Sequence, residues 1–276
     1  MEARDRIVPP TRATEPSHYG PLDIKHTAAV LLTRVDSLLA ETAAGRRLSP
    51  DLAFNLGVLR RRTSSDDVII REFTLRTDPP LKAAIVYIEG LSDNTILTSV
   101  ILPSLMAAAR AAPILPLPAG LPGRVDGSAV LEQLKEVALT QTDIKEEDEW
   151  SGLFKRVLSG DAALLVDGAP VALILGVRHM PERSVEEPTT EAVIRGPRDG
   201  FIESLSVNLA LLRRRLHTPD LRVRKFSVGE RTQTDVAICY LEGLAHPELV
   251  AEVRRRLEAI RIDAVLESGY LESFLE

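Results

Sequence analysis

The sequence predicts an α/β protein of two related α/β modules from an internal duplication, each a small sheet packed with helices. The first observation is a repeat. Shifted by 153 positions, residues 52–91 align with residues 205–244 without a gap, and 16 of the 40 pairs are identical. Unrelated sequences of ordinary composition would share roughly two or three. The second observation is that each repeat reads as helix, strand, strand and helix, an order typical of α/β layers.

The repeats and the segments around them suggest a division of the chain. Residues 1–25 are polar and rich in proline, which predicts a flexible leader. We expect a first module over residues 26–150, opening with a helix over residues 25–43. A second module would cover residues 151–276, and we assign the 162–177 hairpin to it, although the sequence alone also allows this hairpin to belong to the first module.

Each repeat begins with a predicted helix. Ser49-Pro50-Asp51 supplies an N-cap with a proline in the first turn, and Asp199 is the expected cap of the second helix. Arginine triplets at residues 60–62 and 213–215 end both helices, where cations offset the helix dipole. We therefore assign these triplets to helix ends rather than to nucleic-acid binding.

Two predicted strands follow in each repeat. Residues 67–75 and 220–228 contain β-branched and aromatic residues that favour strands. Residues 83–88 and 236–241 are almost continuously apolar, which is typical of strands covered on both faces. Helices are expected next, over residues 94–110, where Pro103 should cause a kink, and over residues 247–260.

The segment between the repeats has its own pattern. Residues 113–127 are rich in proline and glycine, which predicts a loop. Helices are expected over residues 128–137 and 146–158. Asp167-Gly168 lies between the apolar runs 162–166 and 171–177, a strong signal for a hairpin turn.

The bulk composition narrows the class of protein. The formal net charge is −6 and 45% of the residues are hydrophobic, as in ordinary soluble proteins, and the acidic balance argues against general nucleic-acid binding. No apolar run reaches the length of a membrane span, and the N-terminus has no signal-peptide core. The single Cys239 excludes an internal disulfide, and we expect it to be a small buried residue.

No motif predicts catalysis. The chain has no phosphate-binding P-loop, no dinucleotide fingerprint and no nucleophile elbow. Its five histidines show no metal-ligand spacing. We therefore expect no enzyme, no cofactor and no metal site.

One charged segment before the second repeat is the candidate site for an interface or an anion contact. It joins a predicted helix N-terminus to arginines that could attract phosphate or carboxylate. The alternative is that these arginines pair with the neighbouring glutamates and that Asp199 caps the helix. The candidate residues are Arg183, Glu187, Glu191, Arg195, Arg198, Asp199 and Asn208.

The same segment carries a family resemblance. The run Glu191-Ala-Val-Ile-Arg-Gly-Pro-Arg-Asp-Gly-Phe201, with Asn208 and the arginines 213–215, resembles the soluble N-terminal domain of the GerA family. These are A subunits of spore germinant receptors, with stage V sporulation protein AF as a relative. Further matching stretches are residues 67–73, 86–90, 232–243 and 262–270.

The resemblance implies a function and partners. It implies a domain at the cytoplasmic face of the spore inner membrane that serves receptor assembly and signal transmission in germination. The partners it implies are the germinant receptor B and C subunits and other A subunits, with membrane segments outside this chain. The alternative from the residues themselves is a two-lobed module that binds a nutrient or an anion between its lobes.

Overall fold

A computed structural model describes residues 45–77, 80–111, 126–138, 143–179 and 200–275. Its described strands form one five-stranded and one two-stranded sheet, both antiparallel, with helices packed on them. The fold is thus α/β, as predicted, while the duplication stays a prediction. We call residues 45–179 the large subdomain and residues 200–275 the small subdomain. The predicted leader and the helix over residues 25–43 fall outside the described residues.

The large subdomain is built on a sheet with the strand order β1-β2-β4-β5-β3. Its strands are β1 (Val68–Thr77), β2 (Pro80–Ile88), β3 (Ile144–Glu147), β4 (Ala162–Val166) and β5 (Ala172–Leu175). The predicted hairpin is β4–β5, with Gly168 at a positive φ in its turn. This hairpin pairs with β2 and β3, so it lies with the first repeat and not with the second.

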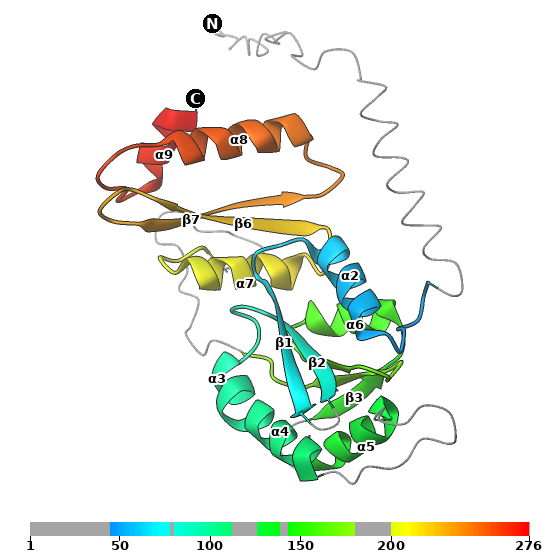
Figure 1. The fold of residues 1–276 in the computed structure, drawn as a ribbon. Helices are drawn as coiled ribbons and strands as arrows, with labels where there is room; N and C mark the ends of the chain where they lie inside the picture. Colours follow the sequence, from blue (N-terminus) through cyan, green and yellow to red (C-terminus); the bar gives the residue numbers. More distant parts are fainter. Residues whose placement is uncertain (1–44, 78–79, 112–125, 139–142, 180–199, 276) are drawn as a thin grey trace, which may run out of the picture. The chain divides into compact units, whose positions relative to one another are not determined.

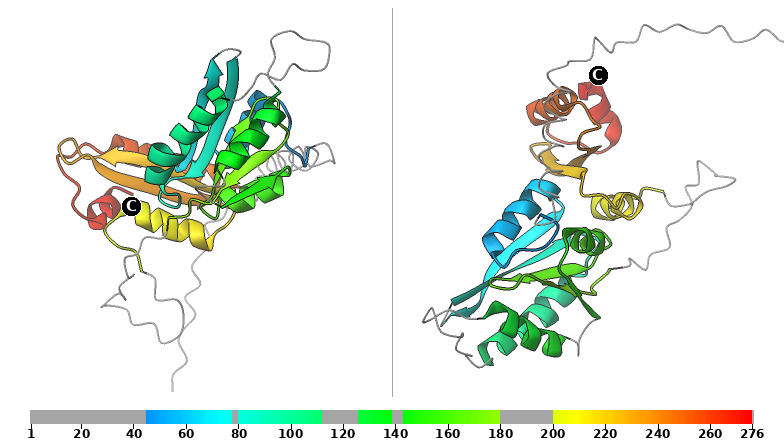
Figure 2. Two further views of the ribbon diagram at one scale, coloured as in Figure 1. Left: turned by 90° about the horizontal axis from the view of Figure 1, so that it is seen from below. Right: turned by 90° about the vertical axis from the view of Figure 1, so that its right-hand side faces the viewer.

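Helices cover both faces of this sheet (Figures 1 and 2). Helices α2 (Leu52–Thr63) and α6 (Trp150–Val157) pack on the face that presents Ala84 and Val86. Helices α4 (Leu102–Ala111) and α5 (Gly127–Ala138) pack on the face that presents Ile85 and Tyr87. Because β2 alternates between two covered faces, all of its residues from Ala83 to Ile88 are buried, as the apolar run predicted.

Two helix predictions need correction, the N-caps and the start of α6. The N-caps of α2 and α7 are Asp51 and Ser204, not Ser49 and Asp199. Residues 144–147 form β3 instead of the first turn of a helix, because they pair with β5, and α6 begins only at Trp150. Pro103 follows a π-helical turn, Leu97–Ile101, that links α3 (Asn94–Ile96) to α4. Proline has no N–H to donate to the preceding turn, so the regular α-helical hydrogen bonding is interrupted here.

The small subdomain has the same opening order of elements. Helix α7 (Leu205–Arg215) precedes the hairpin of β6 (Leu221–Val228) and β7 (Thr234–Leu241). Helices α8 (Pro247–Ala259) and α9 (Ser268–Leu275) follow, and α8 packs Leu257 and Ile260 on one face of the hairpin. Strand β7 is only partly buried, so the prediction that both its faces are covered is wrong. Its twin β2 has β4 beside it, whereas no described strand pairs with the outer edge of β7.

Candidate functional site

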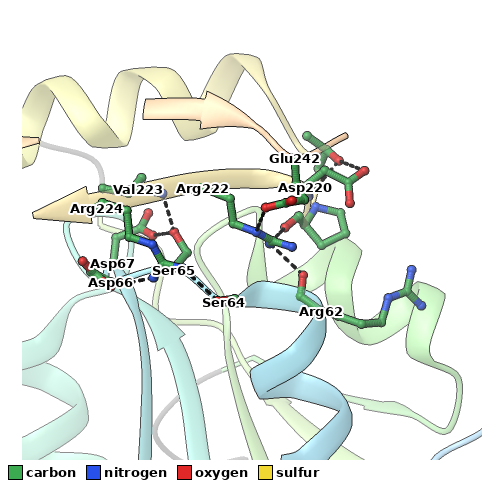
Figure 3. A network of polar contacts seen from close by, with 12 residues as sticks. Arg62, Ser64, Ser65, Asp66, Asp67, Asp220, Arg222, Val223, Arg224 and Glu242 are labelled. Carbon is green, nitrogen blue, oxygen red and sulfur yellow. Dashed lines mark hydrogen bonds and ion pairs between the residues drawn. The ribbon is translucent and has the colours of Figure 1, made fainter. Parts of the chain in front are cut away.

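The candidate site is the junction between the two subdomains. The turn Ser64–Asp67, between α2 and β1, lies against β6 and α7, more than 140 residues later in the chain. We define the junction as this turn, the end of α2 and the side chains of α7 and β6 that contact them. Figure 3 shows the part of it around β6.

A buried ion pair lies at the centre of the junction. Arg213 Nε and Nη2 donate to the two carboxylate oxygens of Asp67 at 2.7 and 2.8 Å, and each side chain is only 1% exposed. Arg213 Nη2 also donates to Ser65 Oγ at 2.9 Å, and Ser65 Oγ donates to Asp67 at 2.6 Å. Two charges can stay buried only when paired and hydrogen-bonded in this way. No buried polar side-chain atom among the described residues lacks a partner.

Backbone hydrogen bonds seat the turn on the outer edge of β6. Asp66 N donates to Val223 O at 2.9 Å, and Val223 N donates to Ser65 Oγ at 2.8 Å. The Asp66 carboxylate accepts from Arg224 Nη1 at 3.0 Å (Figure 3). It also accepts from Lys225 N at 2.9 Å. The turn therefore satisfies groups of β6 that a neighbouring strand would otherwise engage.

Arg222 joins β6 to the end of α2. Its Nη1 donates to Arg62 O at 2.9 Å and to Pro219 O at 2.7 Å, and its Nε donates to Glu242 at 3.3 Å (Figure 3). The last carbonyls of a helix have no partner within the helix. A side chain of the small subdomain thus donates a hydrogen bond to a carbonyl at the C-terminal end of a helix in the large subdomain.

The sequence did not reveal this junction. We assigned Arg213 to a helix end, and it does lie in the last turn of α7, but its main contact is the distant Asp67. Its twin Arg60 pairs with Glu72 at the surface. Asp67 is identical to its counterpart Asp220 in the other repeat, and Arg213 is identical to Arg60. These identities were the only sequence signal that singled out the two residues.

The structure describes one of the seven predicted site residues. Arg183, Glu187, Glu191, Arg195, Arg198 and Asp199 lie outside the described residues. Asn208 is described and holds the start of α7: its Oδ1 accepts from Ile202 N at 2.8 Å, and its Nδ2 donates to Ile202 O at 2.7 Å. Asn55 holds Ser49 in the same way at 2.9 and 2.6 Å. Both bonds of Asn208 therefore serve local structure.

Cys239 differs from its prediction. It is exposed, because none of the described strands pairs with β7 on the side where its twin Val86 meets β4. Partial burial still raises the pKa of the Cys239 thiol; the Asp67 carboxylate raises it further and Arg213 opposes this.

A charged hollow lies beside strands β3 and β5 of the large sheet. It is lined by Asp143, Lys145, Arg156, Asp161, Ile174, Gly176 and Arg178. Arg178 donates two hydrogen bonds of 2.8 Å to Asp161, which raises the pKa of the arginine. Lys145 and Arg156 also have carboxylate partners, Asp143 and Glu147. Since Lys145, Arg156 and Arg178 each have a carboxylate partner, the hollow presents no unpaired cation to an anion.

The part of the chain that the structure describes offers neither a metal site nor a membrane-spanning helix. It contains no cluster of histidine, cysteine and acidic side chains suited to a metal ion. None of its helices combines the length and apolar character that crossing a membrane requires.

Comparison with known proteins decides the family. The sequence profile of the Bacillus/Clostridium GerA spore germination protein matches residues 58–276. The chain belongs to the GerA family. It is 36% identical to spore germination protein KA of Bacillus subtilis over 83% of this chain and 40% of that protein. It is 50% identical to stage V sporulation protein AF of the same organism, over 40% of this chain and 22% of the relative.

A solved structure of the family shares the fold. It is the N-terminal domain of the A subunit of the Bacillus megaterium spore germinant receptor GerK3. The TM-score is 0.59 at 33% identity, over 83% of this chain and 80% of that one. The family resemblance seen in the sequence is thus confirmed. This GerA-family chain spans about two fifths of the length of the curated relatives that match most of it.

Proposed function

We propose that this chain is the cytosol-facing N-terminal domain of a spore germinant receptor A subunit that serves receptor assembly and signal transmission. Its place would be the cytoplasmic face of the spore inner membrane, with B and C subunits and other A subunits as partners. Its similarity to the N-terminal domain of the GerK3 A subunit supports this proposal. A second relative, YfkQ of Bacillus subtilis, is named as a membrane protein and is 36% identical over 84% of this chain.

The observation that carries the signalling part is the buried Asp67–Arg213 pair. A buried, fully hydrogen-bonded pair has one favourable geometry, and its loss leaves an uncompensated charge inside the protein. The junction would therefore pass a displacement of one subdomain to the other instead of absorbing it. Coupling of this kind needs no catalysis and no cofactor.

The test uses the complete receptor subunit in spores. Arg213→Lys keeps the charge but loses the two-pronged contact with Asp67, so we expect slower germinant-triggered germination at normal receptor levels. The control is Arg60→Lys, the same change at the twin position, where the pair is exposed. Wild-type germination rates in the Arg213→Lys spores, with receptor levels verified by immunoblot, would contradict the signalling role.

We also propose that the charged segment from Arg183 to Phe201 contacts a neighbouring subunit or the junction. The support is that this segment has no counterpart at the equivalent positions of the first repeat. Replacing Arg195 and Arg198 with alanine should impair receptor assembly or germination and leave the thermal stability of the isolated domain unchanged. Normal germination together with normal levels of the receptor complex would exclude this role.

A further inference from the structure

Helix α9 is held on the small subdomain by one of its faces. It lies beside α8, and its Leu271 and Leu275 pack on the core of the small subdomain (Figures 1 and 2). Arg256 of α8 donates a hydrogen bond to the Leu275 carbonyl, which has no partner within the helix. The opposite face of α9 therefore points away from this core.

The opposite face of α9 carries large apolar side chains. Tyr270 and Phe274 lie four positions apart, so they share one face of the helix, and they are 45% and 42% exposed. Leu266, in the segment that leads into α9, is 77% exposed. We call these three residues the α9 ridge. Large apolar and aromatic side chains that are exposed within one short stretch are typical of a contact surface.

Acidic side chains accompany the α9 ridge along the chain. Glu267 precedes α9 and Glu272 lies within it, and both are exposed. Neither has an ion-pair partner among the residues that the structure describes. No basic residue occurs from Ile262 to Leu275. A surface that complements the α9 ridge would therefore be apolar and carry positive charge.

Two other kinds of surface match these charges poorly. Helices that lie in a membrane interface usually carry lysine and arginine on their polar face, because the cytoplasmic leaflet is anionic. Lipid headgroups would therefore repel Glu267 and Glu272. The α9 ridge of a second copy would bring the same glutamates against like charges, which is unfavourable at a contact.

The proposed function provides a surface of the required chemistry. In the N-terminal domain of an A subunit, α9 would be the helix after which the rest of the subunit follows. Cytoplasmic loops of membrane proteins carry an excess of lysine and arginine next to the apolar ends of the membrane spans. We propose that the α9 ridge docks on basic cytoplasmic loops of the membrane-spanning portion of the same A subunit. This inference rests on the proposed function and assigns to it the contact between the domain and the membrane portion.

Photo-crosslinking in the complete receptor subunit, expressed in spores, tests this contact. The photoreactive residue p-benzoylphenylalanine in place of Tyr270 keeps an aromatic ring and, on irradiation, links to the surface that covers the α9 ridge. Mass spectrometry of the linked peptides should identify a basic loop between membrane spans of the same subunit. Glu267→Lys together with Glu272→Lys should lower the yield of this link about tenfold, because lysines would then face the basic loop.

Two matched controls show whether the link is specific to the α9 ridge. The photoreactive residue in place of Phe54, an aromatic residue of α2 that is 53% exposed, should not give the link. Glu248→Lys, which reverses the charge of an exposed glutamate of α8, should leave the yield from position 270 unchanged. Circular dichroism of the purified chain checks that the lysine variants are folded.

Several results would overturn the docking proposal. They are a link to lipid, to another subunit or to residues 1–44 or 180–199 of this chain, a link that the two lysines leave unchanged, and the absence of any link. Membrane fractionation of the complete subunit tests the proposed function separately. A subunit that does not sediment with the membrane contradicts the proposed function, whereas a membrane-bound subunit without the link contradicts only the docking.

Discussion

Arg60 and Arg213 show how the same residue at equivalent positions acquires different energetic roles. Both lie in the last turn of a helix and both have a carboxylate partner. Arg60 and Glu72 are 57% and 52% exposed, so water and salt screen their attraction. Arg213 and Asp67 are buried, so removing one leaves the other charged in a medium that solvates it poorly.

This difference predicts unequal costs for the same substitution. Arg213→Ala should lower the free energy of unfolding by about 3–5 kcal/mol, the range for breaking a buried pair. Arg60→Ala should lower the free energy of unfolding by only about 0–1 kcal/mol, the range for exposed ion pairs. Urea denaturation of both variants measures the two values. Equal losses would show that the Asp67–Arg213 pair is not buried in solution.

At the residue level, the sequence predicted local roles better than distant contacts. The arginine triplets at residues 60–62 and 213–215 do end helices. The pairing of Asp67 with Arg213 spans 146 positions, and no short-range pattern encodes such a contact. Cys239 was mispredicted because burial at this position depends on a neighbouring strand, which its twin Val86 has in β4 and which the described residues do not supply to Cys239.

The two Glu-Gly-Leu turns at the ends of β2 and β7 are the clearest case of one element in two environments. Gly90 and Gly243 adopt nearly the same left-handed conformation, with φ of 81° and 78°. A Cβ at Gly90 would lie 3.0 Å from Ser206 O of α7, whereas a Cβ at Gly243 would meet nothing within 4 Å. Only the first turn is therefore closely packed against the small subdomain.

Alanine at these glycines separates backbone strain from packing. Gly243→Ala should lower the free energy of unfolding by about 1 kcal/mol, because a residue with a Cβ is strained in the left-handed conformation. Gly90→Ala should cost more, because the same strain is joined by the close contact with Ser206. Thermal unfolding of the two variants gives the difference, and a loss at Gly90 no greater than at Gly243 would show that α7 is not packed there.

Elements were predictable where the pattern was local. The helix–strand–strand–helix order and the β4–β5 hairpin are confirmed, since turn residues and apolar runs specify them. The start of α6 was mispredicted, because the acidic residues 146 and 147 suit a helix N-terminus but pair with β5 instead. Strand pairing between distant segments, such as β2 with β4, also required the structure.

At the scale of the whole molecule, the junction should make the two subdomains unfold together. Trp150 is the only tryptophan, and it is buried in the large subdomain, where it stacks on Phe154 at 5.7 Å. Its fluorescence therefore reports the large subdomain alone, whereas far-ultraviolet circular dichroism reports both. In the wild type the two urea transitions should coincide.

Breaking the junction should separate these transitions. In Arg213→Ala we expect circular dichroism to fall at lower urea than Trp150 fluorescence, because the small subdomain has fewer buried residues of its own. In Arg60→Ala the two curves should still coincide. Coincident curves in Arg213→Ala would mean that the ion pair does not couple the subdomains.

The contact between Arg222 and the end of α2 has a consequence for the order in which the chain folds. Arg222 lies 160 positions after Arg62, whose carbonyl it completes. During synthesis from the N-terminus, the five strands of the large sheet are made before Arg213 and Arg222. The large sheet can therefore form while the turn that precedes β1 still holds an unpaired aspartate. Asp67 gains its partner only after the last quarter of the chain has been synthesised, so the junction forms late and through long-range contacts.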